Sequence, residues 1–231
     1  MVRLILAFWM LAGPAVAECR LALALALDIS SSVDANEDRL QRLGLANALV
    51  SDEVMQAILS VQGETVALAV FEWSGRNQQD VVLGWRTLTT RAEVLAAAGQ
   101  IRGSQRRNTE FPTAIGFALG YAAQVFAVAP PCLFQTLDVS GDGINNEGFA
   151  PRLAYKHFPL SDVTVNGLVI GGGDTDLMGY YQRELIKGPG AFVEQAADFF
   201  DFERAMQRKL VRELETRAIG MLSAPDAAMG G

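Results

Sequence analysis

The stretch Leu21-Ala22-Leu23-Ala24-Leu25-Ala26-Leu27, followed directly by Asp28-Ile29-Ser30-Ser31-Ser32, decides the fold of this chain. Seven consecutive apolar residues predict a short strand buried on both faces, as in a parallel sheet. In open α/β sheets, ligands bind beyond the carboxyl ends of such strands. The D-x-S-x-S cluster places one carboxylate and two hydroxyls there. Such oxygen ligands suit Mg²⁺, Mn²⁺ or Ca²⁺, which need about six of them, so further ligands must come from elsewhere.

Residues 1–17 have the layout of a cleavable secretory signal peptide. Arg3 precedes a short apolar core, and Ala15-Val16-Ala17 matches an A-x-A cleavage signal. We therefore expect a mature chain that begins at Glu18 and is periplasmic or secreted. No later segment reaches the roughly 18 apolar residues of a membrane-spanning helix, so we expect no integral membrane segment after cleavage.

The mature chain is predicted to hold one domain, residues 18–222, with a flexible tail at residues 223–231. No linker or internal repeat divides residues 18–222. The formal net charge of −7 argues against nucleic acid as a partner. Nothing in the sequence requires more than a monomer.

Two cysteines, Cys19 and Cys132, are present in the sequence. In an exported protein an isolated pair is more often a disulfide than a metal or catalytic site. Cys19 precedes Asp28 by nine residues, and Cys132 precedes Asp142 by ten. If the two strands are parallel neighbours, both cysteines lie at the opposite edge of the sheet, and we predict a Cys19–Cys132 disulfide.

Strand and helix patterns alternate after the first polar loop. Residues 34–37 resemble a capping box and begin a helical periodicity. Further strands are expected at residues 66–71, 81–85, 133–139, 163–170 and near 191–193, and further helices near residues 91–101, 114–127, 155, 180–186 and 201–215. The second and third strands are too close in sequence for a parallel crossover and should form an edge hairpin. The pattern predicts an α/β fold with a doubly wound, mostly parallel sheet covered by helices on both faces.

Two more polar segments should reach the same edge of the sheet. Thr113 stands just before an expected helix, where a hydroxyl is also an ordinary N-cap. Residues 138–148, after the fourth strand, read Asp-Val-Ser-Gly-Asp-Gly-Ile-Asn-Asn-Glu-Gly. Polar residues and glycines this dense predict either a tight turn or a site, with Asp138 and Asp142 as its acids.

Together these motifs resemble the von Willebrand factor A (VWA) domain and its metal-ion-dependent adhesion site (MIDAS). The shared features are D-x-S-x-S after the first strand, a T-x-x-x-x-A-L helix start and an Asp-Gly after the fourth strand. The fourth-strand loop reads Ser-Gly-Asp-Gly in place of the usual Thr-Asp-Gly, so Asp138 stays an alternative to Asp142. The resemblance implies five ligand positions, binding directly or through water: Asp28, Ser30, Ser32, Thr113 and Asp142.

A narrower resemblance covers nearly the whole mature chain. Residues 138–143, 165–168 and 188–193 are similar to a group of uncharacterised exported bacterial proteins that contain a VWA domain. This resemblance implies the fold but no biological role.

The function expected from these features is binding rather than catalysis. A rim-bound Mg²⁺, with Mn²⁺ or Ca²⁺ as alternatives, would keep one coordination position open for the Asp or Glu carboxylate of a protein or envelope component. An enzyme would need a base or nucleophile, and the one histidine, His157, has no G-x-S-x-G partner.

Three other interpretations fit parts of the sequence. Asp28 could be the nucleophile of a Mg²⁺-dependent phosphoryl hydrolase, as in haloacid-dehalogenase-like phosphatases, but the second Asp those enzymes need is replaced by Ser30. A calcium loop at residues 138–149 lacks the bidentate Glu at its twelfth position, which is Phe149. Finally, the loops could be hydrogen-bonded to one another and bind no metal.

Overall fold

The structure is a computed structural model that describes residues 18–171 and 175–222. The predicted signal peptide (residues 1–17) and tail (residues 223–231) lie outside the described residues. Within the described part, no helix has both the length and the apolar character needed to cross a membrane.

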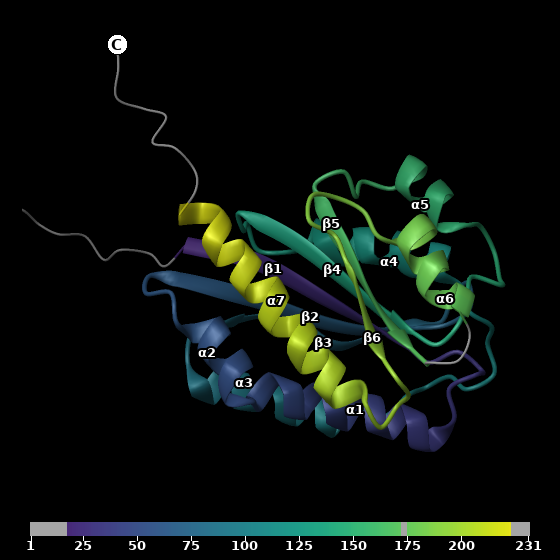
Figure 1. Ribbon diagram of the computed structural model, residues 1–231, viewed down its shortest axis with the longest axis horizontal. Coiled ribbons are helices and arrows are strands. Elements are labelled where there is room, and N and C mark those ends of the chain that lie inside the picture. The colour runs from purple at the N-terminus through teal and green to yellow at the C-terminus, as the bar shows by residue number, and fades with distance from the viewer. Residues whose placement is uncertain (1–17, 172–174, 223–231) are drawn as a thin grey trace, which may run out of the picture.

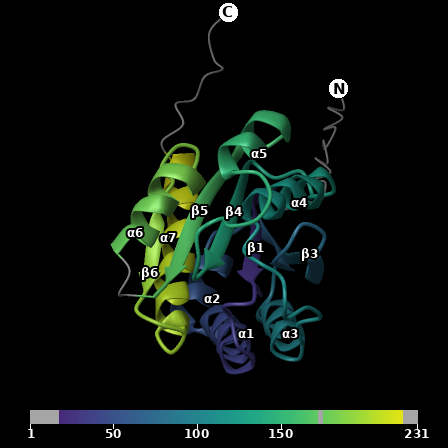
Figure 2. The same ribbon diagram turned by 90° about the vertical axis from the view of Figure 1, so that its right-hand side faces the viewer.

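Six strands form one sheet in the order β3-β2-β1-β4-β5-β6 (Figures 1 and 2). The β2–β3 pair is antiparallel and the other pairs are parallel. The predicted edge hairpin is therefore confirmed. The strands are β1 (Glu18–Asp28), β2 (Glu64–Trp73), β3 (Gln79–Leu88), β4 (Phe134–Gly141), β5 (Val163–Ile170) and β6 (Val193–Ala196).

Helices cover both faces of the sheet, as predicted. One face carries α1 (Ala35–Val50), α2 (Asp52–Leu59), α3 (Arg91–Arg102) and α7 (Phe202–Leu222), which share one apolar core. The other face carries α4 (Ile115–Ala127), α5 (Pro151–His157) and the π-helical turn η1 (Tyr181–Leu185), which share a second core, and α6 (Thr175–Tyr180) leads into η1 (Figure 1).

The central strand β1 alternates large and small apolar side chains between the two cores. Its leucines at positions 21, 23, 25 and 27 lie in the core beneath α1 and α7, and its alanines at positions 22, 24 and 26 lie in the core beneath α4. All seven side chains are buried. This burial on both faces fixes β1 at the centre of the sheet and carries its polar end, Asp28, to the rim.

Several elements differ from the sequence-based expectation. Helix α2 is missing from it, because no glycine or proline separates this helix from α1. The two helices share the cap residue Ser51, whose hydroxyl accepts a hydrogen bond from the Val54 N–H. Strand β6 begins two residues later than expected. The segment expected as one helix near residues 180–186 is the end of α6 followed by η1.

A buried ionic cluster holds α7 against the sheet. Lys209 Nζ lies 3.1 Å from Asp138 Oδ1 on β4 and 2.8 Å from Glu213 Oε1 on α7. The Asn166 side chain on β5 donates to Glu213 at 2.6 Å. All four side chains are buried. Burial raises the pKa of Asp138, and Lys209 opposes that shift.

The predicted disulfide is confirmed. Cys19 and Cys132 are bonded, with their Cα atoms 4.5 Å apart, and the Leu133 N–H donates to the Cys19 carbonyl at 2.9 Å. Because a strand rises about 3.3 Å per residue, this bond lies roughly 30 Å from Asp28. The disulfide therefore joins β1 to the start of β4 at the edge opposite the predicted site.

Replacing both cysteines, Cys19→Ser with Cys132→Ser, should lower the free energy of unfolding by about 2–5 kcal/mol, because the bond closes a long loop in the unfolded chain. The cysteines are 113 residues apart in sequence. Urea unfolding monitored by circular dichroism measures this loss, and the wild type under reductant should coincide with the variant. Identical urea midpoints for the oxidised wild type and the variant would contradict the expectation.

Candidate metal site

The loop that follows β1 is held by its own backbone and by α1. The Ser30 N–H donates to Asp28 Oδ1 at 2.7 Å, and the Val33 N–H donates to the Ser30 carbonyl at 2.9 Å. Gln41, buried on α1, donates from its side chain to the Asp28 carbonyl at 2.8 Å. The predicted capping box at Asp34 and Glu37 starts α1. The loop is thus fixed at both ends.

Hydroxyl groups from two loops meet above Asp28. The Thr113 hydroxyl donates to Ser30 Oγ at 3.3 Å, and Ser30 Oγ lies 3.1 Å from Ser32 Oγ. The Ser32 hydroxyl donates to Asp142 Oδ1, from a third loop, at 2.7 Å. The structure therefore brings together all five residues singled out in the sequence: Asp28, Ser30, Ser32, Thr113 and Asp142.

Thr113 is not a helix cap in this structure. The N-cap of α4 is Ala114, which has no side-chain capping hydrogen bond. The Asn146 side chain instead accepts from the Thr113 N–H at 2.9 Å, and the Asn145 side chain accepts from the Gly116 N–H at 3.1 Å. The β4–α5 loop thus holds the start of α4, and the Thr113 hydroxyl is turned toward the serines.

Asp28 is the most unusual member of the cluster. Its side chain is fully buried, and its Oδ2 atom has no hydrogen-bond partner among the described residues. Burial and the nearby Asp142 charge raise the pKa of Asp28 to about 7, whereas hydrogen bonds from Ser30 and the Asp142 backbone favour the ionised form. A buried carboxylate oxygen without a partner is costly, so it calls for a ligand.

Space beside Asp28 Oδ2 is left by Gly141. A Cβ atom added at Gly141 would lie 2.8 Å from this oxygen and 2.6 Å from the hydroxyl of Tyr181. The Tyr181 hydroxyl is also buried without a hydrogen-bond partner among the described residues. Burial, together with Asp28, raises the pKa of Tyr181 well above its usual value. Two orphaned polar groups therefore border one small space.

Asp138 does not join the five residues. It lies within β4, paired with Leu25 on β1 and Asn166 on β5, and its carboxylate contacts Lys209 of α7. The alternative of Asp138 facing the metal is therefore wrong for this structure. Asp138 lies inside both the expected strand (residues 133–139) and β4, where Leu137 and Val139 point into the core beneath α4 and Asp138 points toward α7.

A solvent-filled cleft of about 450 Å³ opens above the cluster. Ser32, Thr113 and Asp142 line its floor, and Ile144 and Leu177 add apolar surface to its walls. In the described part of the chain, no three His, Cys, Asp or Glu side chains converge as a metal site. The donor set at this cleft is instead two carboxylates and three hydroxyls, which favours a hard cation over zinc-type nitrogen and sulfur chemistry.

Several residues that shape the site were not identified in the sequence. Gln41, Asn145, Asn146 and Tyr181 all act through tertiary contacts with a residue of the cluster or its loops. The asparagines stood within the recognised loop at residues 138–148, but nothing in their spacing indicated that they bind α4. No sequence signal pointed to Tyr181.

Solved structures share this fold. Proximal thread matrix protein 1 (PTMP1) from the mussel byssus matches with a TM-score of 0.62 and 17% identity, over 86% of this chain and 49% of that chain. A von Willebrand factor type A protein from Catenulispora acidiphila matches with a TM-score of 0.55 and 16% identity, over 87% of this chain and 43% of that chain. BatB from Bacteroides thetaiotaomicron matches with a TM-score of 0.57 and 20% identity, over 86% of this chain and 99% of that chain. The chain spans about half the length of the mussel chain. These matches confirm the predicted VWA-like α/β fold.

One of the mussel structures, described as having a zinc-occupied MIDAS motif, matches with a TM-score of 0.61 and 19% identity, over 86% of this chain and 48% of that chain. Among curated proteins, no sequence matches. The family model described as "Protein of unknown function (DUF1194)" matches residues 18–218. Because this match covers most of the chain, the protein belongs to the DUF1194 family, and its fold is VWA-like.

Proposed function

We propose that this chain is an exported, divalent-cation-dependent binding module. The cation would be held by Asp28, Ser30, Ser32, Thr113 and Asp142. The observation that carries the proposal is the buried, unpartnered Oδ2 atom of Asp28 beneath a group of converging hydroxyls. A bound cation would satisfy this oxygen, which the protein itself leaves without a partner.

Mg²⁺ is the cation we propose, with Mn²⁺ or Ca²⁺ as alternatives. Carboxylate and hydroxyl oxygens suit these hard ions, and two carboxylates and three hydroxyls leave room for one more ligand in an octahedral shell of about six. The zinc-occupied MIDAS motif of the mussel protein supports a divalent cation at the corresponding place in the fold.

The ligand we propose for the open position is an Asp or Glu carboxylate of a partner protein or envelope component. The three hydroxyls add no negative charge to that of the two carboxylates, so the bound ion stays a strong Lewis acid and can take an anionic group as its last ligand. The cleft above Ser32, Thr113 and Asp142 is wide enough to admit a side chain from a partner. Export, through the signal peptide proposed at residues 1–17, would place a monomer in the periplasm or outside the cell.

The phosphoryl hydrolase interpretation has no observation in its favour. Asp28 is fully buried, whereas a nucleophile must reach the phosphorus atom of its substrate. Position 30, where those enzymes carry a second acid, holds a serine that is hydrogen-bonded to Thr113 and Ser32. Hydrolysis of a generic aryl phosphate by the wild type that is lost in Asp28→Asn would reverse this judgement.

Calorimetric titration of the metal-stripped protein with Mg²⁺ should show saturable binding that is lost in Asp28→Asn and Thr113→Val. Thr113→Val removes a hydroxyl ligand, and Asp28→Asn removes the negative charge and one oxygen of the carboxylate. Each should cost more than the roughly 10- to 100-fold in affinity that an outer-sphere partner contributes. Asp138→Asn is the matched control, since Asp138 contacts Lys209 and not the cluster, and it should bind like the wild type. Loss of binding in Asp138→Asn alone would contradict the proposed ligand set.

Asp28→Asn should also separate a metal-binding role from a structural one. Without Mg²⁺ the variant should be at least as resistant to urea as the wild type, because a buried carboxylate is exchanged for a neutral amide. At a Mg²⁺ concentration about 100 times its dissociation constant, the wild type should gain about 2.7 kcal/mol in unfolding free energy and the variant nothing. A metal-independent loss of stability in Asp28→Asn would favour loops that serve only to hold the fold.

A further inference from the structure

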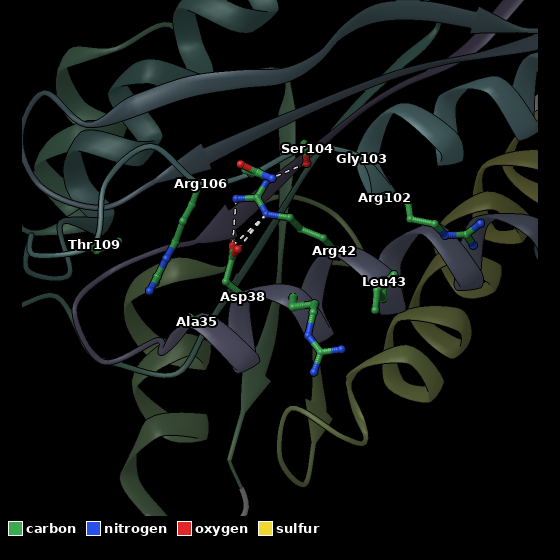
Figure 3. Close-up of a pocket in the computed structure, with 11 residues that line it drawn as sticks. Ala35, Asp38, Arg42, Leu43, Arg102, Gly103, Ser104, Arg106 and Thr109 are labelled. Atoms are coloured by element: carbon green, nitrogen blue, oxygen red, sulfur yellow. Dashed lines mark hydrogen bonds and ion pairs between the residues drawn. The ribbon is translucent and has the colours of Figure 1, made fainter.

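A second cleft, of about 630 Å³, lies beside the loop that follows β1, which we call the metal loop. It runs between α1 and the segment that follows α3 (Figure 3). Four arginines line it, Arg39, Arg42, Arg102 and Arg106, with Asp38 as the one acidic residue in its lining. We call it the arginine cleft. Its charge contrasts with the net charge of −7 for the whole chain.

Arg42 forms a rigid floor for the arginine cleft. It is 2% exposed, and its Nε donates to both oxygens of Asp38 at 2.9 and 3.1 Å (Figure 3). It also donates to Ser104 at 2.8 Å and to Glu72 on β2 at 2.6 Å. Asp38 and Glu72 are thus engaged by Arg42 and do not neutralise the other three arginines.

The other three arginines are held by neutral oxygens. Arg39 donates to the Asn36 side chain at 2.5 Å, Arg102 to the Asn47 side chain at 2.7 Å, and Arg106 to the Val33 carbonyl at 2.5 Å. Of the four arginines that line the cleft, Arg42 is the one that forms ion pairs with carboxylates among the described residues, and its partners are Asp38 and Glu72. Each guanidinium has five N–H donors, so most donors of these three are left for a ligand.

The arginine cleft adjoins the five-residue cluster of the candidate metal site. Arg106 donates to Val33, the residue directly after Ser32 of the cluster. The same two chain segments line both clefts, since residues 31–38 and 109–113 contribute to each. A partner seated on the metal would therefore have a positively charged surface beside it.

We propose that the arginine cleft binds further acidic side chains of the partner whose carboxylate the metal captures, so that the ligand is an acidic peptide segment. The inference rests on the proposed function. Guanidinium groups bind carboxylates through paired hydrogen bonds. Arg102 and Arg106 lie on opposite sides of the Asp38–Arg42 pair (Figure 3), so they suit charges spaced along a chain rather than one compact phosphate. Ala35 and Leu43 add apolar surface for the stems of Glu side chains.

The test measures binding of a fluorescent hexaglutamate peptide to the purified protein by anisotropy, at low ionic strength, with and without Mg²⁺. The cleft variant is Arg39→Gln with Arg102→Gln. Arg42 and Arg106 stay intact, because Arg42 holds a buried network and Arg106 holds the metal loop. The matched control is Arg86→Gln with Arg91→Gln, which changes the net charge equally at residues outside both clefts.

We expect the cleft variant to weaken peptide binding in Mg²⁺ by about tenfold or more, because two charged hydrogen-bonding groups are lost. The control should stay within about twofold of the wild type, and both variants should keep wild-type Mg²⁺ affinity in calorimetry. Inorganic phosphate should compete no better than glutarate.

Equal weakening in the cleft variant and the control would overturn the inference, since only general charge attraction would remain. Wild-type binding in the cleft variant, with binding lost on Mg²⁺ removal, would also overturn it while leaving the proposed metal function intact. Binding that depends on the arginines but not on Mg²⁺ would support the cleft and overturn metal capture. Displacement by phosphate at far lower concentration than glutarate would overturn the acidic peptide as ligand.

Discussion

The burial of one carboxylate at the end of the central strand is the constraint on which the rest of this rim depends. Strand β1 is packed on both faces, so its last residue, Asp28, reaches the edge of the sheet still enclosed by protein. Bulk solvent does not reach an oxygen in that position, and burial strongly disfavours its charge. This one group is surrounded by the neighbouring hydroxyls, by Gly141 and by the side chain of Tyr181.

Much of the fold could be predicted because its signals are local. The strand expected at residues 163–170 matches β5 to the residue, and the capping box marked the start of α1. The missed helix α2 shows the limit of such signals, since it follows α1 with no glycine or proline between them. The site depended on three polar segments, each directly after a strand or before a helix, and on their resemblance to the VWA motif, which implied the five residues that the structure brings together.

What the sequence did not reveal depends on side-chain direction and on distant contacts. Asp138 lies inside the strand in both the expectation and the structure, and its direction toward α7 depends on which helix covers that side of the sheet, which no local pattern shows. The arginine cleft joins side chains more than sixty residues apart, with Arg42 and Ser104 in direct contact. Scattered arginines in an acidic chain gave no hint that four of them line one cleft.

The capping of α4 by a distant loop has a consequence for how the chain acquires its site. Because Ala114 offers no side-chain cap, the N–H groups of Thr113 and Gly116 find hydrogen-bond partners only when Asn146 and Asn145 arrive from beyond β4. Contacts between residues so far apart in sequence require closure of long loops, which is slow and follows the formation of local structure. The site should thus be among the last parts of the molecule to be completed during folding, after the sheet order is established. A nascent chain would lack a finished cluster until residues beyond 146 have been synthesised.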